Sequence, residues 1–433
     1  MSTIAQRTVE NFAARVAAQA FSIAGAIVVA RMLGPAGKGA FSYAGTVLAM
    51  LQMANAGQAA AISWQYAKQR RSPAELLTAM VRILLLFALP ACALLVIIAG
   101  LMPDQRALLA VALALPFALF AQSSMGFFLA DGDVRMVNVQ QILIGVVSVA
   151  AYIPLLIFAH AGLGVLLAVW ACGYVVGALY SAWRLRRYAH DGQATPGANV
   201  VKEQLVYGGQ VSLNSAVQFL NFRIDVFLIM FMLGQTQLGI YSIGIGIGEM
   251  LWQLSRPMVT AAFGSISRGT EREAANTTAA CMRHSFALVL TGAVIIYFAV
   301  PPLVPLVYGP QFANAAIVAR VLLPGIIAYS MMPTLATFFA QQLGQPRIPL
   351  IFSSVSTALC AGITVLLLPH VGIIGGAIAT SVSYCVAFAA AVTYFVRRTR
   401  IGPRQIFALS RSDLNPYRAL LASIYRRAKP AEN

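Results

Sequence analysis

One twelve-residue stretch occurs twice in this chain, at residues 32–43 (MLGPAGKGAFSY) and at residues 232–243 (MLGQTQLGIYSI). A long apolar segment precedes each copy and another follows it. Because glycine permits the positive φ angles of tight turns, each copy predicts a turn between two hydrophobic helices. Two such turns in one chain indicate an internally duplicated structure. The residues that coincide are Met32 and Met232, Leu33 and Leu233, Gly34 and Gly234, Gly39 and Gly239, and Ser42 and Ser242.

The composition is that of a membrane protein. Hydrophobic residues make up 59% of the chain and charged residues 10%, whereas soluble domains hold about 45–50% apolar and about 25% charged residues. The first apolar segment carries Arg15 and has no cleavage site, which favours a retained span over a signal peptide. The five cysteines match no metal-site or disulfide spacing. In a membrane protein, the net charge of +17 is attributed to basic residues that set the topology of the spans. No nucleic-acid partner is therefore expected.

The apolar segments define the expected architecture. A spanning helix needs about 20 mainly apolar residues, and each half of the chain holds six such segments, so both halves enter the membrane in the same direction. The prediction is an all-α integral membrane protein with twelve transmembrane helices, arranged as two parallel six-helix repeats around a central cavity. The expected spans are 10–31, 40–62, 76–101, 107–130, 137–159, 163–183, 205–233, 238–262, 278–300, 314–341, 348–369 and 373–396. The expected divisions are an N-terminal lobe (1–190), a cytoplasmic linker (191–204), a C-terminal lobe (205–396) and a basic cytoplasmic tail (397–433).

Shorter matches support the duplication. Gly132 begins GDVR between the fourth and fifth spans, and Gly344 begins GQPR between the tenth and eleventh. Gly162 and Gly372 stand just before the sixth and twelfth spans. Lys and Arg concentrate on the side of the N-terminus, which predicts that both termini are cytoplasmic. The basic tail fits an interfacial amphipathic helix or a disordered segment.

Polar residues on the seventh span share one face. Gln210, Asn214, Gln218, Asn221 and Asp225 recur at helical spacing, within a stripe of about 80°. The first span carries a matching set. Polar groups in a bilayer usually face a cavity or another helix, and two matched stripes favour a cavity. The matching set is Thr8, Asn11, Arg15, Gln19 and Ser22.

The eighth span carries a third polar face, which includes Glu249 and Arg256. An isolated charge in a span costs about 2.5–3.5 kcal/mol on insertion scales, so each must be compensated. Asp225 and Glu249 are therefore either protonatable or ion-binding carboxylates, or members of structural ion pairs. No enzyme is indicated, because the four histidines lack metal-ligand spacing and no nucleophile–base pair is recognisable. No catalytic residue, metal site or cofactor is predicted.

Several motifs together resemble the polysaccharide and oligosaccharide-lipid flippases (O-antigen and exopolysaccharide translocases) of the multidrug/oligosaccharidyl-lipid/polysaccharide exporter superfamily. They span nearly the whole chain, in the order that the family shows. The motifs are ARMLGP at 30–35, RID at 223–225, GIYS at 239–242, EMLW at 249–252, YGPQF at 308–312, LGQPR at 343–347 and GIIGGA at 372–377.

The resemblance implies a two-lobed transporter that works by alternating access in the bacterial plasma (inner) membrane. The implied cargo is a polyprenyl-pyrophosphate-linked oligosaccharide, and polysaccharide assembly proteins are possible partners beside the membrane lipids. Arg15 and Arg256 suit a pyrophosphate, and Asn11, Gln19 and the amides of the seventh span suit sugar hydroxyls. Asp225 or Glu249 would couple flipping to H⁺ or Na⁺.

Three other functions remain open. A cation-coupled multidrug exporter of the same superfamily would favour an acidic cavity, whereas the predicted polar faces carry mixed charges. A membrane glycan polymerase or ligase uses similar lipid-linked substrates, but the short outer connections and the two-fold repeat count against it. A flippase for the peptidoglycan precursor is a related branch, which the absence of spans beyond twelve disfavours.

Overall fold

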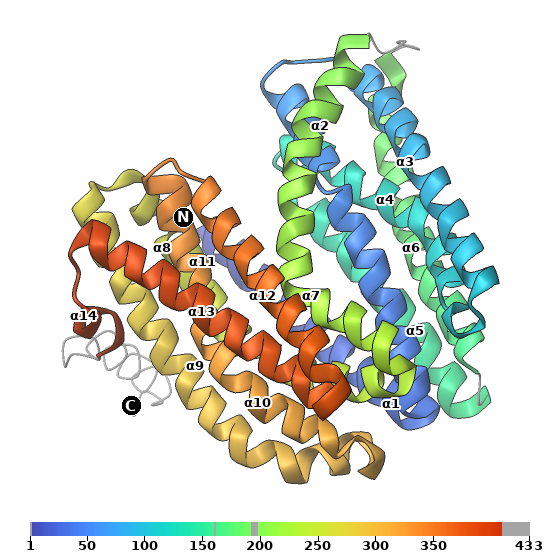
Figure 1. The fold of residues 1–433 in the computed structure, drawn as a ribbon. Helices are drawn as coiled ribbons and strands as arrows, with labels where there is room; N and C mark the ends of the chain where they lie inside the picture. The colour runs from blue at the N-terminus through green and yellow to red at the C-terminus, as the bar shows by residue number, and fades with distance from the viewer. Residues whose placement is uncertain (1, 160–161, 192–197, 409–433) are drawn as a thin grey trace, which may run out of the picture. The chain divides into compact units, whose positions relative to one another are not determined.

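The computed structural model describes residues 2–159, 162–191 and 198–408, which form helices without a strand (Figure 1). The long helices are joined by short turns, as the periodic apolar segments predicted. The first half comprises α1 (Ser2–Ala54), α2 (Gly57–Ala67), α3 (Pro73–Leu101), η1 (Pro103–Gln105), α4 (Leu108–Ala130), α5 (Val134–Ala159), α6 (Leu163–Leu185) and η2 (Arg186–Asp191). The second half comprises α7 (Ala198–Glu249), α8 (Trp252–Arg268), α9 (Glu271–Tyr308), η3 (Pro310–Phe312), α10 (Asn314–Tyr329), α11 (Met332–Thr337), η4 (Phe338–Gln342), α12 (Arg347–Val371), α13 (Ile373–Thr399) and α14 (Pro403–Phe407).

The two predicted glycine turns are one-residue breaks in long helices. Gly34 interrupts α1 at φ 65° and ψ −172°, and Gly234 interrupts α7 at φ 81° and ψ −177°. A side chain is strained at such positive φ angles, which explains why glycine stands at both positions. Gly132 and Gly344 also match, at φ 71° and φ 65°. Gly162 and Gly372 differ in backbone conformation, because φ is −75° at Gly162 and 61° at Gly372.

Three predicted spans are interrupted. The span expected at 40–62 breaks between α1 and α2, and the span expected at 238–262 breaks between α7 and α8. The span expected at 314–341 consists of α10, α11 and the π-helical η4. Pro333 stands in the first turn of α11, where its missing N–H leaves no helical bond unmade. These short interruptions do not disturb the apolar periodicity, so composition alone does not reveal them.

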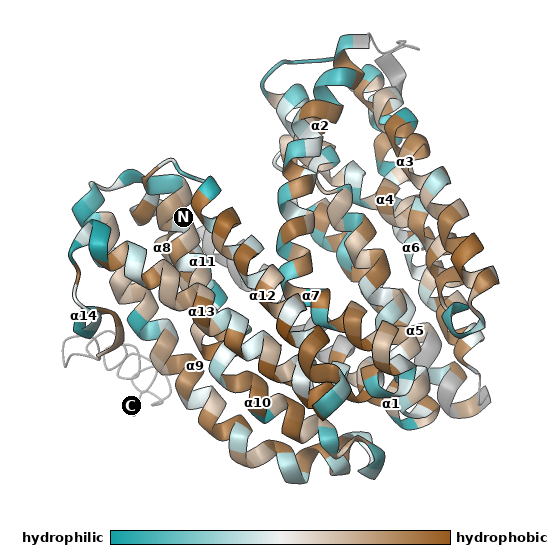
Figure 2. Ribbon diagram, viewed as in Figure 1, coloured by the Kyte–Doolittle hydropathy of each residue, from teal (hydrophilic) through white to brown (hydrophobic). Residues whose placement is uncertain are grey.

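The chain is a multi-span integral membrane protein. Within the described ranges, 8 helical segments are long and apolar enough to cross a membrane. Figure 2 shows apolar residues along the middle of these helices and polar residues toward many of their ends. The segments are Pro73–Leu101, Pro103–Ala130, Leu163–Tyr188, Asn199–Glu249, Glu271–Tyr308, Pro310–Gln342, Arg347–Val371 and Ile373–Thr399.

The chain packs as two compact units that each combine distant parts of the sequence. Unit 1 comprises residues 1–245, 300–318 and 357–379, and unit 2 comprises residues 246–299, 319–356 and 380–433. In unit 1, α3, α4 and α6 pack around a core rich in alanine, which lets helices approach closely where lipid provides no hydrophobic driving force. In unit 2, the rings of Tyr329 and Tyr384 lie 4.3 Å apart, with Trp252 against both.

The two repeated stretches contact each other inside unit 1. A Cβ on Gly39 would lie 1.8 Å from the carbonyl oxygen of Gln235, and a Cβ on Gly239 would lie 1.9 Å from that of Pro35. Nearby, the hydroxyl of Ser42 donates to that of Ser242 at 3.1 Å. The contact is therefore reciprocal, as expected of duplicated elements that face each other. It explains why glycine stands at position 39 in the first copy and at position 239 in the second.

A lysine is buried beside this contact. Lys38 lies between the first two predicted spans, is 9% exposed, and donates from Nζ to the Ser42 hydroxyl at 3.1 Å. Burial lowers its pKa to about 8, because removal from water penalises the ammonium form. Arg31, before the break, instead donates from Nε to the Val307 carbonyl at 2.7 Å. Near the first glycine break, Lys38 is therefore held by a side-chain hydroxyl and Arg31 by a backbone carbonyl.

Candidate functional site

The polar stripe of α7 divides into an exposed part and a buried part. Gln210, Asn214 and Gln218 are exposed, at the four-residue spacing that places them on one face. Asn221 and Asp225, further along the same helix, are each only 2% exposed. The predicted polar face of α7 is therefore exposed from Gln210 to Gln218 and buried at Asn221 and Asp225. Only the exposed part is open to a solute.

Asp225 lies in a hydrogen-bonded pocket within unit 1. The hydroxyl of Tyr241 donates to Asp225 Oδ2 at 2.5 Å, and the Val226 amide donates to Oδ1 at 2.8 Å. Tyr241 is completely buried, and a Cβ on Gly376 would lie 3.3 Å from its hydroxyl oxygen. These donors satisfy both oxygens of a carboxyl group that is buried away from water. Sequence reasoning missed Tyr241 as the partner, because the break at Gly234 separates the two residues along the chain.

Asn221 is held by a hydroxyl from a distant part of unit 1. Its Oδ1 accepts a hydrogen bond from the Thr357 hydroxyl at 3.4 Å. Thr357 belongs to α12, so this buried amide joins α7 to a helix more than a hundred residues later. Asn221 therefore serves as a helix–helix hydrogen-bonding residue, which was one of the two roles expected for such amides. Gln210, Asn214 and Gln218 are exposed and remain available to a ligand.

A cavity of about 420 Å³ opens beside the first turns of α7. Its aromatic wall consists of Trp64 on α2 and Tyr207 on α7, whose rings stack with centroids 5.3 Å apart and planes at 6°. Both rings are partly exposed. The polar lining includes Gln210, which joins the predicted stripe to this cavity. The lining residues are Trp64, Asn199, Lys202, Glu203, Val206, Tyr207 and Gln210.

Close packing of α2 against α7 positions this lining. A Cβ on Gly57 would lie 1.8 Å from the carbonyl oxygen of Gly208, so the two backbones touch where both residues are glycine. The Gly57 amide donates to the Ser212 hydroxyl at 3.0 Å. In Figure 1, α2 lies beside the beginning of α7. The glycines thus allow the approach that brings Trp64 and Tyr207 together.

Charged and amide groups complete the rim. Glu203 forms an ion pair with Arg71 at 3.7 Å and accepts a hydrogen bond from Gln65 Nε2 at 3.4 Å. Lys202 is exposed on the rim. Within the cavity lining, Glu203 is therefore balanced by Arg71, and Lys202 adds positive charge. The sequence analysis missed Trp64, Tyr207 and this use of Lys202, although Tyr207 stands one turn before Gln210.

The other predicted site residues lie elsewhere. Asn11, Arg15 and Gln19 fall on α1, and their side chains lie outside the described residues. Glu249 ends α7 and is half-buried, and Arg256 is exposed on α8; both belong to unit 2. Among described positions, no group of three His, Cys, Asp or Glu residues could hold a metal ion.

The chain belongs to the polysaccharide biosynthesis protein family, whose sequence model matches residues 5–270. No curated protein sequence matches it significantly. Its fold is that of the transporters of the multidrug/oligosaccharidyl-lipid/polysaccharide (MOP) exporter superfamily, as the sequence resemblance predicted.

Three solved structures illustrate the likeness. The lipid II flippase MurJ, in an inward closed conformation, has a TM-score of 0.74 at 11% identity, over 98% of this chain and 94% of that chain. An inward-facing multidrug resistance MATE family transporter has a TM-score of 0.71 at 16% identity, over 88% and 94%. A MOP superfamily transporter from Pyrococcus furiosus has a TM-score of 0.60 at 15% identity, over 90% and 93%. At these identities the likeness shows the fold alone.

Proposed function

We propose that this protein is a flippase that moves a polyprenyl-pyrophosphate-linked oligosaccharide across the bacterial plasma membrane by alternating access. The family and the fold support a transporter of lipid-linked cargo. The observation that carries the proposal is the exposed amide face of α7, which begins in the cavity at Gln210 and continues through Asn214 and Gln218. Such a face suits a cargo with many hydroxyl groups.

The cavity has groups for each part of a glycan. The amides of Asn199 and Gln210 donate and accept hydrogen bonds, as sugar hydroxyls require. The partly exposed rings of Trp64 and Tyr207 offer an apolar surface for the C–H face of a sugar. Lys202 supplies a cation for the pyrophosphate. A multidrug exporter for organic cations is less well supported, because Glu203 is paired with Arg71.

The larger arrangement is also part of the proposal. We infer twelve spans in two parallel repeats around a central cavity, with lobes at 1–190 and 205–396, a linker at 191–204 and a tail at 397–433. Both termini then lie in the cytoplasm, and the cavity at Lys202 lies on the side where cytoplasmic cargo would enter. Arg15 and Arg256 are each proposed as a cation for the pyrophosphate, and Asn11 and Gln19 as further amides for sugar hydroxyls.

The proposed coupling group is Asp225, with Glu249 as the alternative. Asp225 is buried yet hydrogen-bonded by Tyr241, so a proton or Na⁺ that reaches it would compete with that hydrogen bond. Such a competition would link ion binding to the packing of α7. Glu249 is half-buried and belongs to the other compact unit. Neighbouring polysaccharide assembly proteins would supply and remove the cargo.

Flipping by the purified protein tests this proposal. The full chain is reconstituted in vesicles with a fluorescent polyprenyl-pyrophosphate oligosaccharide, and a membrane-impermeant reagent reports cargo in the outer leaflet. We expect flipping by the natural protein, with rates at least about tenfold lower for Trp64→Ala and for Gln210→Ala, because each removes direct contacts. Trp183→Ala and Gln345→Ala serve as matched controls, because both residues are exposed and neither lines the cavity. Equal rates in all five proteins would overturn the site.

A further inference from the structure

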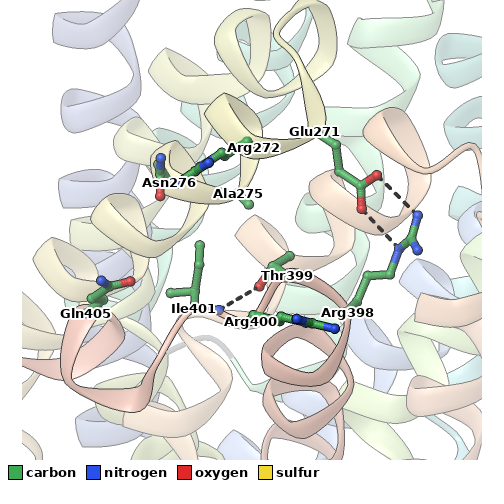
Figure 3. A pocket seen from close by; sticks show the side chains of 9 residues that line it. All are labelled: Glu271, Arg272, Ala275, Asn276, Arg398, Thr399, Arg400, Ile401 and Gln405. Atoms are coloured by element: carbon green, nitrogen blue, oxygen red, sulfur yellow. Dashed lines mark hydrogen bonds and ion pairs between the residues drawn. The ribbon is translucent and has the colours of Figure 1, made fainter.

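A second cavity lies at one end of unit 2, outside the proposed cargo site. Its volume is about 540 Å³, and it is enclosed by the beginning of α9, the end of α13 and α14 (Figure 3). Three arginines and one acidic residue line it, together with hydroxyl and amide groups. The lining residues are Glu271, Arg272, Ala275, Asn276, Arg398, Thr399, Arg400, Ile401 and Gln405.

One acidic residue neutralises only one of the three arginines. Arg398 meets Glu271 with both Nε and Nη2, at 3.0 and 3.1 Å, which is the fork-to-fork geometry that fixes a guanidinium. Arg272 and Arg400 have no acidic partner and donate no side-chain hydrogen bond among the residues that the structure describes. Two positive charges therefore remain in the cavity for an anion.

One of these two arginines, Arg400, has an unfavourable backbone conformation. Arg400 follows the end of α13 with φ 58°, a left-handed conformation that normally favours glycine. Its amide donates to the Val396 carbonyl at 2.8 Å, which closes the helix end. A side chain is strained in this conformation, because its Cβ lies too close to the following carbonyl oxygen. The chain thus holds Arg400 at the cavity in a strained conformation, as backbones often do at ligand sites.

The short helix α14, which forms the third wall of the cavity, is held in place by contacts with the rest of unit 2. The ring of Phe407 on α14 packs against Phe286 and Phe388, with centroids 5.4 and 6.3 Å away. The Gln405 carbonyl accepts a hydrogen bond from Arg283 Nη1 at 2.6 Å. Ile406 is completely buried. The short helix is thus fixed in place, and it keeps Gln405 at the edge of a preformed cavity.

The chemistry of this lining fits a phosphate group. Arginine forks recognise phosphate by paired hydrogen bonds, and Asn276, Thr399 and Gln405 offer neutral groups for the remaining oxygens. The cavity lies at the ends of α9 and α13, which are both long and apolar enough to span a membrane. The ends of spanning helices lie at the level of lipid headgroups, where basic pockets between helices bind anionic lipids.

We propose that this cavity binds the phosphate of an anionic ligand through Arg272 and Arg400, separately from the cargo. The source is the headgroup of an anionic phospholipid or a soluble phosphate, which share the chemistry that the lining recognises. Arg398 acts as a positioned third cation, because Glu271 holds its guanidinium. The proposal depends on neither the cargo nor the direction of transport, so its outcome is independent of the flippase assignment.

Binding by the purified full-length protein tests the site in two arms. In one arm, native mass spectrometry counts phosphatidylglycerol retained from mixed micelles, with phosphatidylcholine as the neutral comparison. In the other arm, titration calorimetry measures inorganic phosphate. Phosphatidylglycerol binding alone identifies a headgroup site, and binding of inorganic phosphate identifies a site for soluble phosphate.

The variants decide whether this cavity is responsible. We expect the double variant Arg272→Gln with Arg400→Gln to bind at least about tenfold more weakly, because hydrogen bonds to charged groups are lost. Arg400→Gly alone should retain the fold, since glycine suits φ 58° at that position. The matched control is Arg347→Gln, an exposed arginine of unit 2 outside the cavity. Unchanged binding by the double variant, or an equal loss in the control, overturns the proposal.

Discussion

The buried carboxyl group of Asp225 accepts a hydrogen bond from the phenol of Tyr241, which lies beyond the helix break at Gly234. Tyr241→Phe removes the 2.5 Å hydrogen bond but leaves the ring, so we predict a loss of about 1.5–3 kcal/mol of stability, as for other hydrogen bonds to charged groups. Thermal unfolding in detergent measures the loss. In an Asp225→Leu background the same change should cost little. Additive effects of the two substitutions would show that the pair does not act as a unit.

Lys38 is a buried cation whose removal should stabilise the protein. Its folded pKa of about 8 lies below the ordinary lysine value of 10.5, so burial of the ammonium destabilises the folded state. This cost, roughly 3 kcal/mol, is fully present below about pH 8 and is lost as pH rises to about 10.5. We predict that Lys38→Met raises the unfolding temperature at pH 7 and raises it less at pH 10. A gain that grows with pH would contradict this account.

The contact between α2 and α7 depends on glycine at a particular position. A Cβ on Gly57 would lie 1.8 Å from a backbone carbonyl oxygen, whereas a Cβ on Gly209 meets nothing within 4 Å. We therefore predict that Gly57→Ala destabilises the protein by about 1–3 kcal/mol, the usual cost of overpacking. Gly209→Ala, on the same pair of helices, should leave stability nearly unchanged. The comparison of their unfolding temperatures checks this directly.

The long helices and their two glycine breaks follow from local sequence, whereas the other interruptions and the lining of the site do not. Apolar periodicity predicted the long helices, and repeated glycines predicted the breaks at Gly34 and Gly234. The spacing of Gln210, Asn214 and Gln218 predicted their shared face. The stack of Trp64 on Tyr207 required the packing of α2 on α7, which no local pattern contains. For the same reason, the partner of Asp225 became apparent only in the folded chain.

The two repeated stretches of the chain meet through their corresponding glycines. The reciprocal approach of Gly39 and Gly239, together with the Ser42–Ser242 hydrogen bond, joins equivalent parts of the two repeats within unit 1. In the proposed arrangement of two parallel repeats, alternating access would move one repeat against the other. A lipid-linked glycan is the cargo that we propose for this movement, in keeping with the polysaccharide biosynthesis family.

The location of the cargo in a strain that lacks this protein tests the central claim most directly. Membranes of the deletion strain are fractionated, and the leaflet that holds the lipid-linked oligosaccharide is identified with an impermeant reagent. The flippase account predicts that the cargo accumulates in the inner leaflet and that surface polysaccharide is lost. Normal surface polysaccharide, together with raised sensitivity to cationic drugs, would contradict the account and assign the protein to multidrug export.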